Sequence, residues 1–213
     1  MNTPQLPIST AHYTDELALA IDTMVAQRHC VVPGLFAPEL MSALHSELLE
    51  HVHRDGLQEA KVGQGEQLLR MESIRGDEIR WLNGETPAQA TFLAIMEEYR
   101  LMLNRQLFLG LVELEAHFAH YPPGTGYVTH LDSFENNNQR RITIVVYLNP
   151  AWDETDGGEL QIMDDGEVRL SVAPLSGTLV TFVSEEVEHQ VATTQRDRYS
   201  IAGWFRVRDP NLL

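Results

Sequence analysis

The chain has 213 residues, 43% of them hydrophobic and 22% charged, a composition typical of one soluble globular domain. Its formal net charge of −16 argues against nucleic acid as a partner, because phosphate backbones are bound by basic surfaces. A single cysteine, Cys30, excludes an internal disulfide and any multi-thiolate metal site, so a bound metal would need histidine and carboxylate ligands.

The N-terminal half of the sequence is typical of helices joined by short connections. Residues 1–13 are expected to form a flexible tail, which lacks the basic start and apolar core of a secretory signal. No window reaches the ~18 apolar residues of a membrane span, so we expect a cytoplasmic protein without a membrane partner. Apolar residues at three-to-four spacing predict helices over residues 14–27, 38–53 and 86–107, with Thr14 as the first N-cap. A short strand is expected at 29–32, and the polar residues 57–67 are typical of a mobile loop.

From Leu111 onward the hydrophobic period changes to that of strands. Seven or eight short β-branched and aromatic runs are separated by turn sequences such as PPGTG and DETDGG. This pattern predicts an antiparallel sandwich or barrel, with a jelly roll as the natural closure. We expect residues 14–213 to form one domain, in which residues 14–110 supply helices packed outside and residues 111–208 form the β core.

Three histidines are followed two positions later by an acidic residue: His45 by Glu47, His53 by Asp55, and His130 by Asp132. The first two pairs fall on a predicted helix, where positions i and i+2 point in different directions and do not converge on one ion. The third lies in an extended segment, where alternate side chains share a face. Geometry therefore favours His130 and Asp132 as metal ligands.

A third ligand has to come from another part of the chain. His189 is the best candidate, because it follows the strong strand pattern GTLVTFVS and the turn-like SEEVE. The alternative is an ordinary surface histidine after an acidic loop. Two histidines and one carboxylate would form the facial triad of non-haem Fe(II) oxygenases, which leaves coordination positions open.

Two later strands carry partly polar faces. In RYSIAGWF one face holds Arg198, Ser200, Ala202 and Trp204, and in RITIVVYLN one face holds Arg141, Thr143, Val145 and Tyr147. We expect both faces to line the interior. An arginine inside a barrel is a costly unpaired charge unless an anion meets it, so Arg198 indicates a bound carboxylate, which the Tyr147 hydroxyl would also reach.

The ordered set of motifs resembles the 2-oxoglutarate and Fe(II)-dependent oxygenases, most closely the prolyl 4-hydroxylase branch that contains the hypoxia-factor prolyl hydroxylases. After H-x-D come YLN-x-x-W, GG-x-L, G-T-L-V-x-F, H-x-V and R-Y-x-I-x-x-W. Upstream, IRGDEIRW and YPPGTGYVTHLD extend the likeness, which covers about residues 70–206. The loop before Ser73 and the segment ENNNQRR differ from the family pattern, which leaves the substrate open.

The resemblance implies a double-stranded β-helix that binds Fe(II) through His130, Asp132 and His189. The cosubstrate 2-oxoglutarate would place its far carboxylate against Arg198 and Tyr147, with O2 as the oxidant and ascorbate as a reductant. Residues near the cosubstrate and metal would include Tyr121, Thr143 and Trp204. Residues on the substrate side would include Tyr127, Arg75 and Arg141, under a loop within residues 55–73.

The activity implied by the resemblance is hydroxylation of a prolyl residue at C4 in an exposed loop of an intracellular protein, with release of succinate and CO2. Bacterial relatives in this branch suggest elongation factor Tu as that protein. The alternatives are an oxygenase of the same fold acting on a small molecule or another side chain, a non-enzymatic cupin-like metal-binding module, and a structural jelly roll without metal. The histidine pairs at 51 and 53 and at 117 and 120 are interpreted as incidental.

Overall fold

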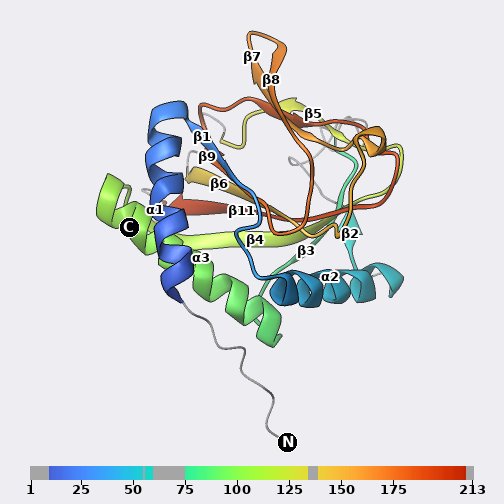
Figure 1. Cartoon of the computed structure of the whole chain (residues 1–213), viewed down its shortest axis with the longest axis horizontal. Helices are drawn as coiled ribbons and strands as arrows, with labels where there is room; N and C mark the ends of the chain where they lie inside the picture. The colour runs from blue at the N-terminus through green and yellow to red at the C-terminus, as the bar shows by residue number, and fades with distance from the viewer. Residues whose placement is uncertain (1–9, 55, 60–74, 134–138, 210–213) are drawn as a thin grey trace, which may run out of the picture.

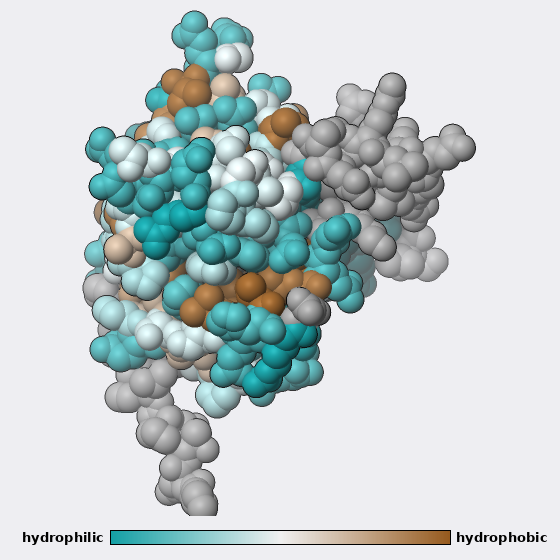
Figure 2. Space-filling view, turned by 90° about the vertical axis from the view of Figure 1, so that its right-hand side faces the viewer, coloured by the Kyte–Doolittle hydropathy of each residue, from teal (hydrophilic) through white to brown (hydrophobic). Residues whose placement is uncertain are grey.

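Two antiparallel sheets and three helices make up the structure, a computed structural model that describes residues 10–54, 56–59, 75–133 and 139–209 (Figure 1). The helices cover the outer face of the larger sheet, and the smaller sheet lies on the opposite side (Figure 1). The face seen in Figure 2 is largely hydrophilic, with small hydrophobic patches between polar side chains. None of the described helices is long and apolar enough to cross a membrane.

The three predicted helices are present: α1 Thr10–Gln27, α2 Pro38–His53 and α3 Pro87–Leu107. Thr86 caps α3, since its hydroxyl accepts a hydrogen bond from the Gln89 backbone N–H at 3.2 Å. Helix α1 begins at Thr10 rather than at the predicted Thr14. The ring of Tyr13 packs on Phe36 with centroids 6.1 Å apart, and this tertiary contact stabilises an extra turn that local capping signals do not indicate.

The larger sheet has seven strands in the order β1-β9-β6-β11-β4-β3-β2. Its strands are β1 His29–Val32, β2 Gln58–Glu59, β3 Glu78–Trp81, β4 Leu111–Tyr121, β6 Arg140–Tyr147, β9 Leu179–Val183 and β11 Arg198–Val207. The smaller sheet has the order β5-β10-β7-β8, with β5 Tyr127–His130, β7 Leu160–Asp164, β8 Glu167–Val172 and β10 His189–Val191. A short 3-10 helix, η2 Glu154–Asp156, precedes β7. Two facing antiparallel sheets of this kind form the predicted double-stranded β-helix.

Strand β6 separates two hydrophobic clusters, as its alternating pattern predicts. One face, with Ile142, Ile144, Val146 and Leu148, packs with the helices. The other face adds Val145 and Tyr147 to a smaller cluster shared with Leu160, Ile162 and Val172 of the opposite sheet. The polar side chains of this inner face therefore lie between the sheets. The predicted tail before Thr10 and most of the predicted substrate loop (residues 55 and 60–74) lie outside the described residues.

Candidate metal and cosubstrate site

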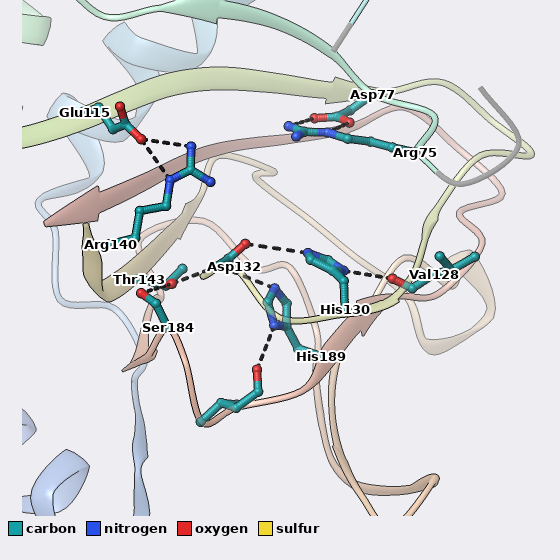
Figure 3. A network of polar contacts seen from close by, with 11 residues as sticks. Arg75, Asp77, Glu115, Val128, His130, Asp132, Arg140, Thr143, Ser184 and His189 are labelled. Atoms are coloured by element: carbon teal, nitrogen blue, oxygen red, sulfur yellow. Dashed lines mark hydrogen bonds and ion pairs between the residues drawn. The ribbon is translucent and has the colours of Figure 1, made fainter. Parts of the chain in front are cut away.

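Three predicted metal ligands meet at one edge of the smaller sheet. His130 ends β5, Asp132 follows it, and His189 opens β10, where it pairs directly with His130. Their ligand atoms all lie within 4.8 Å of one another, and each histidine Nε2 is 3.6 Å from an Asp132 carboxylate oxygen (Figure 3). His189 is 5% exposed, so the surface-histidine alternative is wrong.

Backbone carbonyls fix the orientation of both imidazoles. Nδ1 of His130 donates to the Val128 carbonyl oxygen at 2.8 Å, and Nδ1 of His189 donates to that of Val187 at 3.1 Å (Figure 3). A carbonyl oxygen only accepts, so each Nδ1 carries the proton and each Nε2 keeps its lone pair. Both lone pairs are on the side of Asp132, which is the arrangement that a metal ion requires.

Asp132 is a buried carboxylate that stays ionised. Burial raises its pKa, but the neighbouring His189 and His130 and a hydrogen bond from Thr143 outweigh burial, so the pKa lies below its usual range. The Thr143 hydroxyl lies 2.8 Å from one Asp132 oxygen and 2.9 Å from the Ser184 hydroxyl. The predicted cosubstrate residue Thr143 therefore contacts the metal ligand.

Replacing Thr143 with valine is expected to weaken Mn(II) binding by roughly tenfold, because a partner that orients a metal ligand is lost while side-chain shape is kept. Calorimetric titration of Mn(II) into the purified protein measures the change. Thr143→Ser keeps the hydroxyl and serves as the matched control, with an affinity near that of the wild type. Equal affinities for the valine and serine variants would show that the hydroxyl does not support Asp132.

Arg198 is 1% exposed and lies between two tyrosines. Its guanidinium carbon is 5.1 Å from the Tyr121 ring centroid and 5.2 Å from that of Tyr147. Nε donates to the Gly158 carbonyl oxygen at 2.7 Å, and Nη1 donates to the Ser200 hydroxyl at 3.3 Å. Among the described residues no carboxylate pairs with it, so the predicted unpaired buried cation is present.

The Tyr147 hydroxyl is buried and has no hydrogen-bond partner within the described part of the chain. Burial raises the pKa of Tyr147 to about 12, although Arg198 opposes the shift, so the phenol keeps its proton. A buried donor without an acceptor is costly. An unpaired guanidinium beside an unsatisfied phenol fits a carboxylate that accepts from both.

The spacing along β6 relates this carboxylate position to the metal position. Thr143 contacts Asp132, and Tyr147, four residues further on the same face, contacts Arg198. Four strand residues span roughly 13 Å. Because the metal ligands and the Arg198 side chain reach into this span from its two ends, the remaining gap fits a small dicarboxylate. The residues present therefore fit both Fe(II) on two imidazoles and one carboxylate and 2-oxoglutarate between the metal and Arg198.

The two glycines of the GG-x-L motif, Gly157 and Gly158, lie close to Arg198 and to Thr193. Gly157 and Gly158 have φ values of 66° and 71°, which favour glycine. A Cβ on Gly157 would collide with the Thr193 carbonyl oxygen. The two glycines thus let the chain approach closely enough for Gly158 to accept from Arg198.

Trp204 lies on the inner face as predicted and is 5% exposed, and its indole N–H is buried without a partner among the described residues. The Arg140 guanidinium stacks 3.6 Å from its ring centroid and pairs with Glu115 at 2.8 Å. Strand alternation predicts Arg141 rather than Arg140 on this face. The Arg141 guanidinium lies 3.3 Å from Glu185, and its place on the substrate side stays a prediction. A register irregularity between β11 and this end of β6 explains why Arg140 rather than Arg141 packs on Trp204, because it interrupts the strict alternation of faces.

Arg75 and Asp77 form a buried pair, with Nε and Nη2 of Arg75 2.6 and 2.9 Å from the two Asp77 oxygens. Arg75 also forms an antiparallel bridge with Tyr127 of β5, which ties this segment to the smaller sheet. The Arg75 guanidinium lies 5.2 Å from the Tyr127 ring centroid, and this ring stacks on His130 at 3.6 Å. Two predicted substrate-side residues therefore border the metal site.

Comparison with known proteins agrees with this geometry. The family model described as 2OG-Fe(II) oxygenase superfamily matches residues 116–206. Human Egl nine homolog 1 is 33% identical over 141 residues, which are 62% of this chain and only 33% of that protein. The mouse prolyl hydroxylase EGLN3 is 30% identical over 180 residues, which are 80% of this chain and 75% of that protein.

A solved structure extends the likeness to nearly the whole chain. The crystal structure of a Pseudomonas putida prolyl-4-hydroxylase is 37% identical, with a TM-score of 0.82, and the match covers 91% of this chain and 100% of that one. Motif order, ligand geometry and these relatives agree, and the chain belongs to the 2OG-Fe(II) oxygenase superfamily, in its prolyl hydroxylase branch.

Proposed function

We propose that this protein is an Fe(II)- and 2-oxoglutarate-dependent dioxygenase that hydroxylates C4 of a prolyl residue in an intracellular protein. The observation that carries the proposal is the combination of the clustered His130, Asp132 and His189, of which the last two are buried, with an unpaired Arg198 on the same inner surface. A jelly roll with a purely structural role needs neither feature. Burial of a carboxylate, an imidazole and a cation is costly unless ligands compensate it.

When bound at the triad, Fe(II) with 2-oxoglutarate and O2 supplies the oxidative chemistry, in which one oxygen atom enters succinate and the other a substrate C–H bond, with loss of CO2. The protein provides the ligand geometry. His130 and His189 are pre-oriented by carbonyl oxygens, and Arg198 and Tyr147 hold the far carboxylate of the cosubstrate. Burial of His189, Arg198 and Tyr147 between the sheets excludes water from these three groups.

A peptide substrate is supported by the space beside the metal ligands. A cavity of about 480 Å³ is lined by Tyr127 and Val128 of β5, by Gln190 and Val191 of β10, and by Arg75 and Thr125. His130 and His189 lie on the same two strands but do not line it. This volume lies in the range of small-ligand pockets and admits a side chain with its flanking backbone. Tyr127, which lines the cavity and stacks on His130, offers an aromatic surface on which a pyrrolidine ring can pack. The relatives described above are prolyl hydroxylases, which points to the same residue type.

Mass spectrometry tests the proposal directly. The protein is incubated with Fe(II), 2-oxoglutarate, ascorbate and candidate proteins, with elongation factor Tu as the first. We expect a mass gain of one oxygen on a single proline, together with stoichiometric succinate. Asp132→Asn, which loses a metal-ligating charge, is expected to give neither product. Succinate released only with small molecules, and none with proteins, would replace this proposal by a same-fold oxygenase of small substrates.

A further inference from the structure

His120 takes no part in the site described above, yet both of its ring nitrogens have anionic partners. Nδ1 lies 3.2 Å from Glu78 Oε2, and Nε2 lies 2.8 Å from Asp197 Oδ1. The imidazole side chain is 6% exposed, while the Glu78 and Asp197 side chains are 42% and 52% exposed. We call these three residues the His120 clamp. It joins β3, β4 and the turn before β11.

The clamp lies directly behind the cosubstrate site. Glu78, His120 and Tyr199 are register partners across β3, β4 and β11, and Tyr121 pairs with Arg198 in the next row. Because neighbouring residues on a strand point to opposite faces, these two rows occupy opposite sides of the sheet. Each strand that the clamp joins therefore presents a site residue one position away: Asp77 beside Glu78, Tyr121 beside His120, and Arg198 beside Asp197.

The hydrogen-bond chemistry of the clamp depends on the charge of the ring. Ionised carboxylates only accept, so two carboxylates require N–H on both ring nitrogens, and a neutral imidazole has one. The other groups packed around His120 are Tyr199, which stacks on it at 5.1 Å, and His45 of α2, whose ring contacts Tyr199 edge-on at 5.2 Å. Arg196, in the turn before β11, acts electrostatically on Tyr199 and is paired with Asp156 at 3.2 Å. A ring with N–H on both nitrogens would hold together two carboxylates that otherwise repel each other.

We propose that His120 is a positioning residue for cosubstrate binding: by bridging Glu78 and Asp197 it fixes β3 and the start of β11 against β4, and so holds Tyr121 and Arg198 where they meet 2-oxoglutarate. The inference rests on the proposed function for the identity of the cosubstrate. His117, on the opposite face, contacts Trp81 and Trp204, so the two histidines of the H-x-x-H motif do not share an ion.

The test measures 2-oxoglutarate affinity without turnover. Calorimetry on the Mn(II)-loaded protein without O2 gives the Kd of 2-oxoglutarate for the wild type and for His120→Gln, which keeps one donor and removes the charge. We expect the variant to bind 2-oxoglutarate roughly tenfold more weakly near neutral pH. The affinity for Mn(II) should stay within twofold, because no clamp residue contacts the triad.

Comparing two affinities separates positioning from a general structural role. A general structural defect would weaken the binding of Mn(II) and of 2-oxoglutarate together, whereas loss of positioning weakens only the binding of 2-oxoglutarate. An unchanged Kd of 2-oxoglutarate in His120→Gln would overturn the proposal, and an equal loss of both affinities would replace positioning by a general structural role.

Asp197→Asn provides a second, milder variant, because its half-exposed side chain can be changed with little effect on folding. We expect the same direction of change, about threefold in the Kd of 2-oxoglutarate. His53→Gln, at an exposed position on α2, is the matched control and should match the wild type. Failure of the wild type to bind 2-oxoglutarate at all would refute the proposed function. Normal binding in the wild type and in both clamp variants would refute only the role of His120.

Discussion

Alanine in place of His189 is expected to weaken metal binding strongly and to lower 2-oxoglutarate turnover by about 1000-fold or more. The imidazole is one of the three clustered metal-ligating groups among the described residues, it is buried, and its Nδ1–H is held by the Val187 carbonyl oxygen. The remaining His130 and Asp132 give a two-coordinate site, which binds a divalent ion weakly. Succinate formation measures the loss of turnover, and calorimetry with Mn(II) measures the loss of the metal.

A thermal scan provides a separate readout. A ligand that binds only the folded state raises its stability, so Mn(II) should raise the Tm of the wild type and leave that of His189→Ala unchanged. His53→Gln, which removes an exposed histidine, should behave as the wild type in all three measurements. Retention of metal-dependent activity in His189→Ala would mean that the three side chains are not the metal site.

Strand alternation made much of this site predictable. The inner faces of β6 and β11 follow from a period of two, since one face of each strand is apolar and packs on the helices. Arg198 could be predicted as a ligand-binding residue because an unpaired charge on an inner face is costly unless an anion binds to it. His130 and Asp132 were separated from two similar pairs by the same reasoning, because only an extended backbone turns both side chains to one side.

Other features of the site depend on which strands pair and in which register, and local sequence patterns do not reveal this pairing. His189 and His130 are 59 residues apart in number and become neighbours only because β10 pairs with β5 in one register. The His120 clamp brings Glu78 and Asp197 together from distant turns, so neither residue has a local signal. Arg140 was missed because a register irregularity moves it to the face that alternation assigns to Arg141.

Replacing Arg198 with methionine has effects of opposite sign on binding and on stability. We expect the KM for 2-oxoglutarate to rise by about 100-fold or more, because the charge-assisted pair with the far carboxylate is lost from a buried site. In the absence of cosubstrate the same change should raise the free energy of unfolding by roughly 1 kcal/mol. Removal of an unpaired buried cation outweighs the loss of its bonds to Gly158 and Ser200.

Arg198→Lys distinguishes charge from shape in this effect. Lysine keeps the positive charge but lacks the planar fork, so its KM should lie between those of the wild type and the methionine variant. Denaturant unfolding with and without 2-oxoglutarate, on Mn(II)-loaded protein, provides the decisive comparison. The wild type should gain stability from the cosubstrate, whereas the methionine variant should start more stable and gain nothing, so the two unfolding curves exchange order. If methionine instead destabilised the free protein by several kcal/mol, Arg198 would be a structural cation with an internal partner, and the inference of a bound dicarboxylate would lose its physical basis.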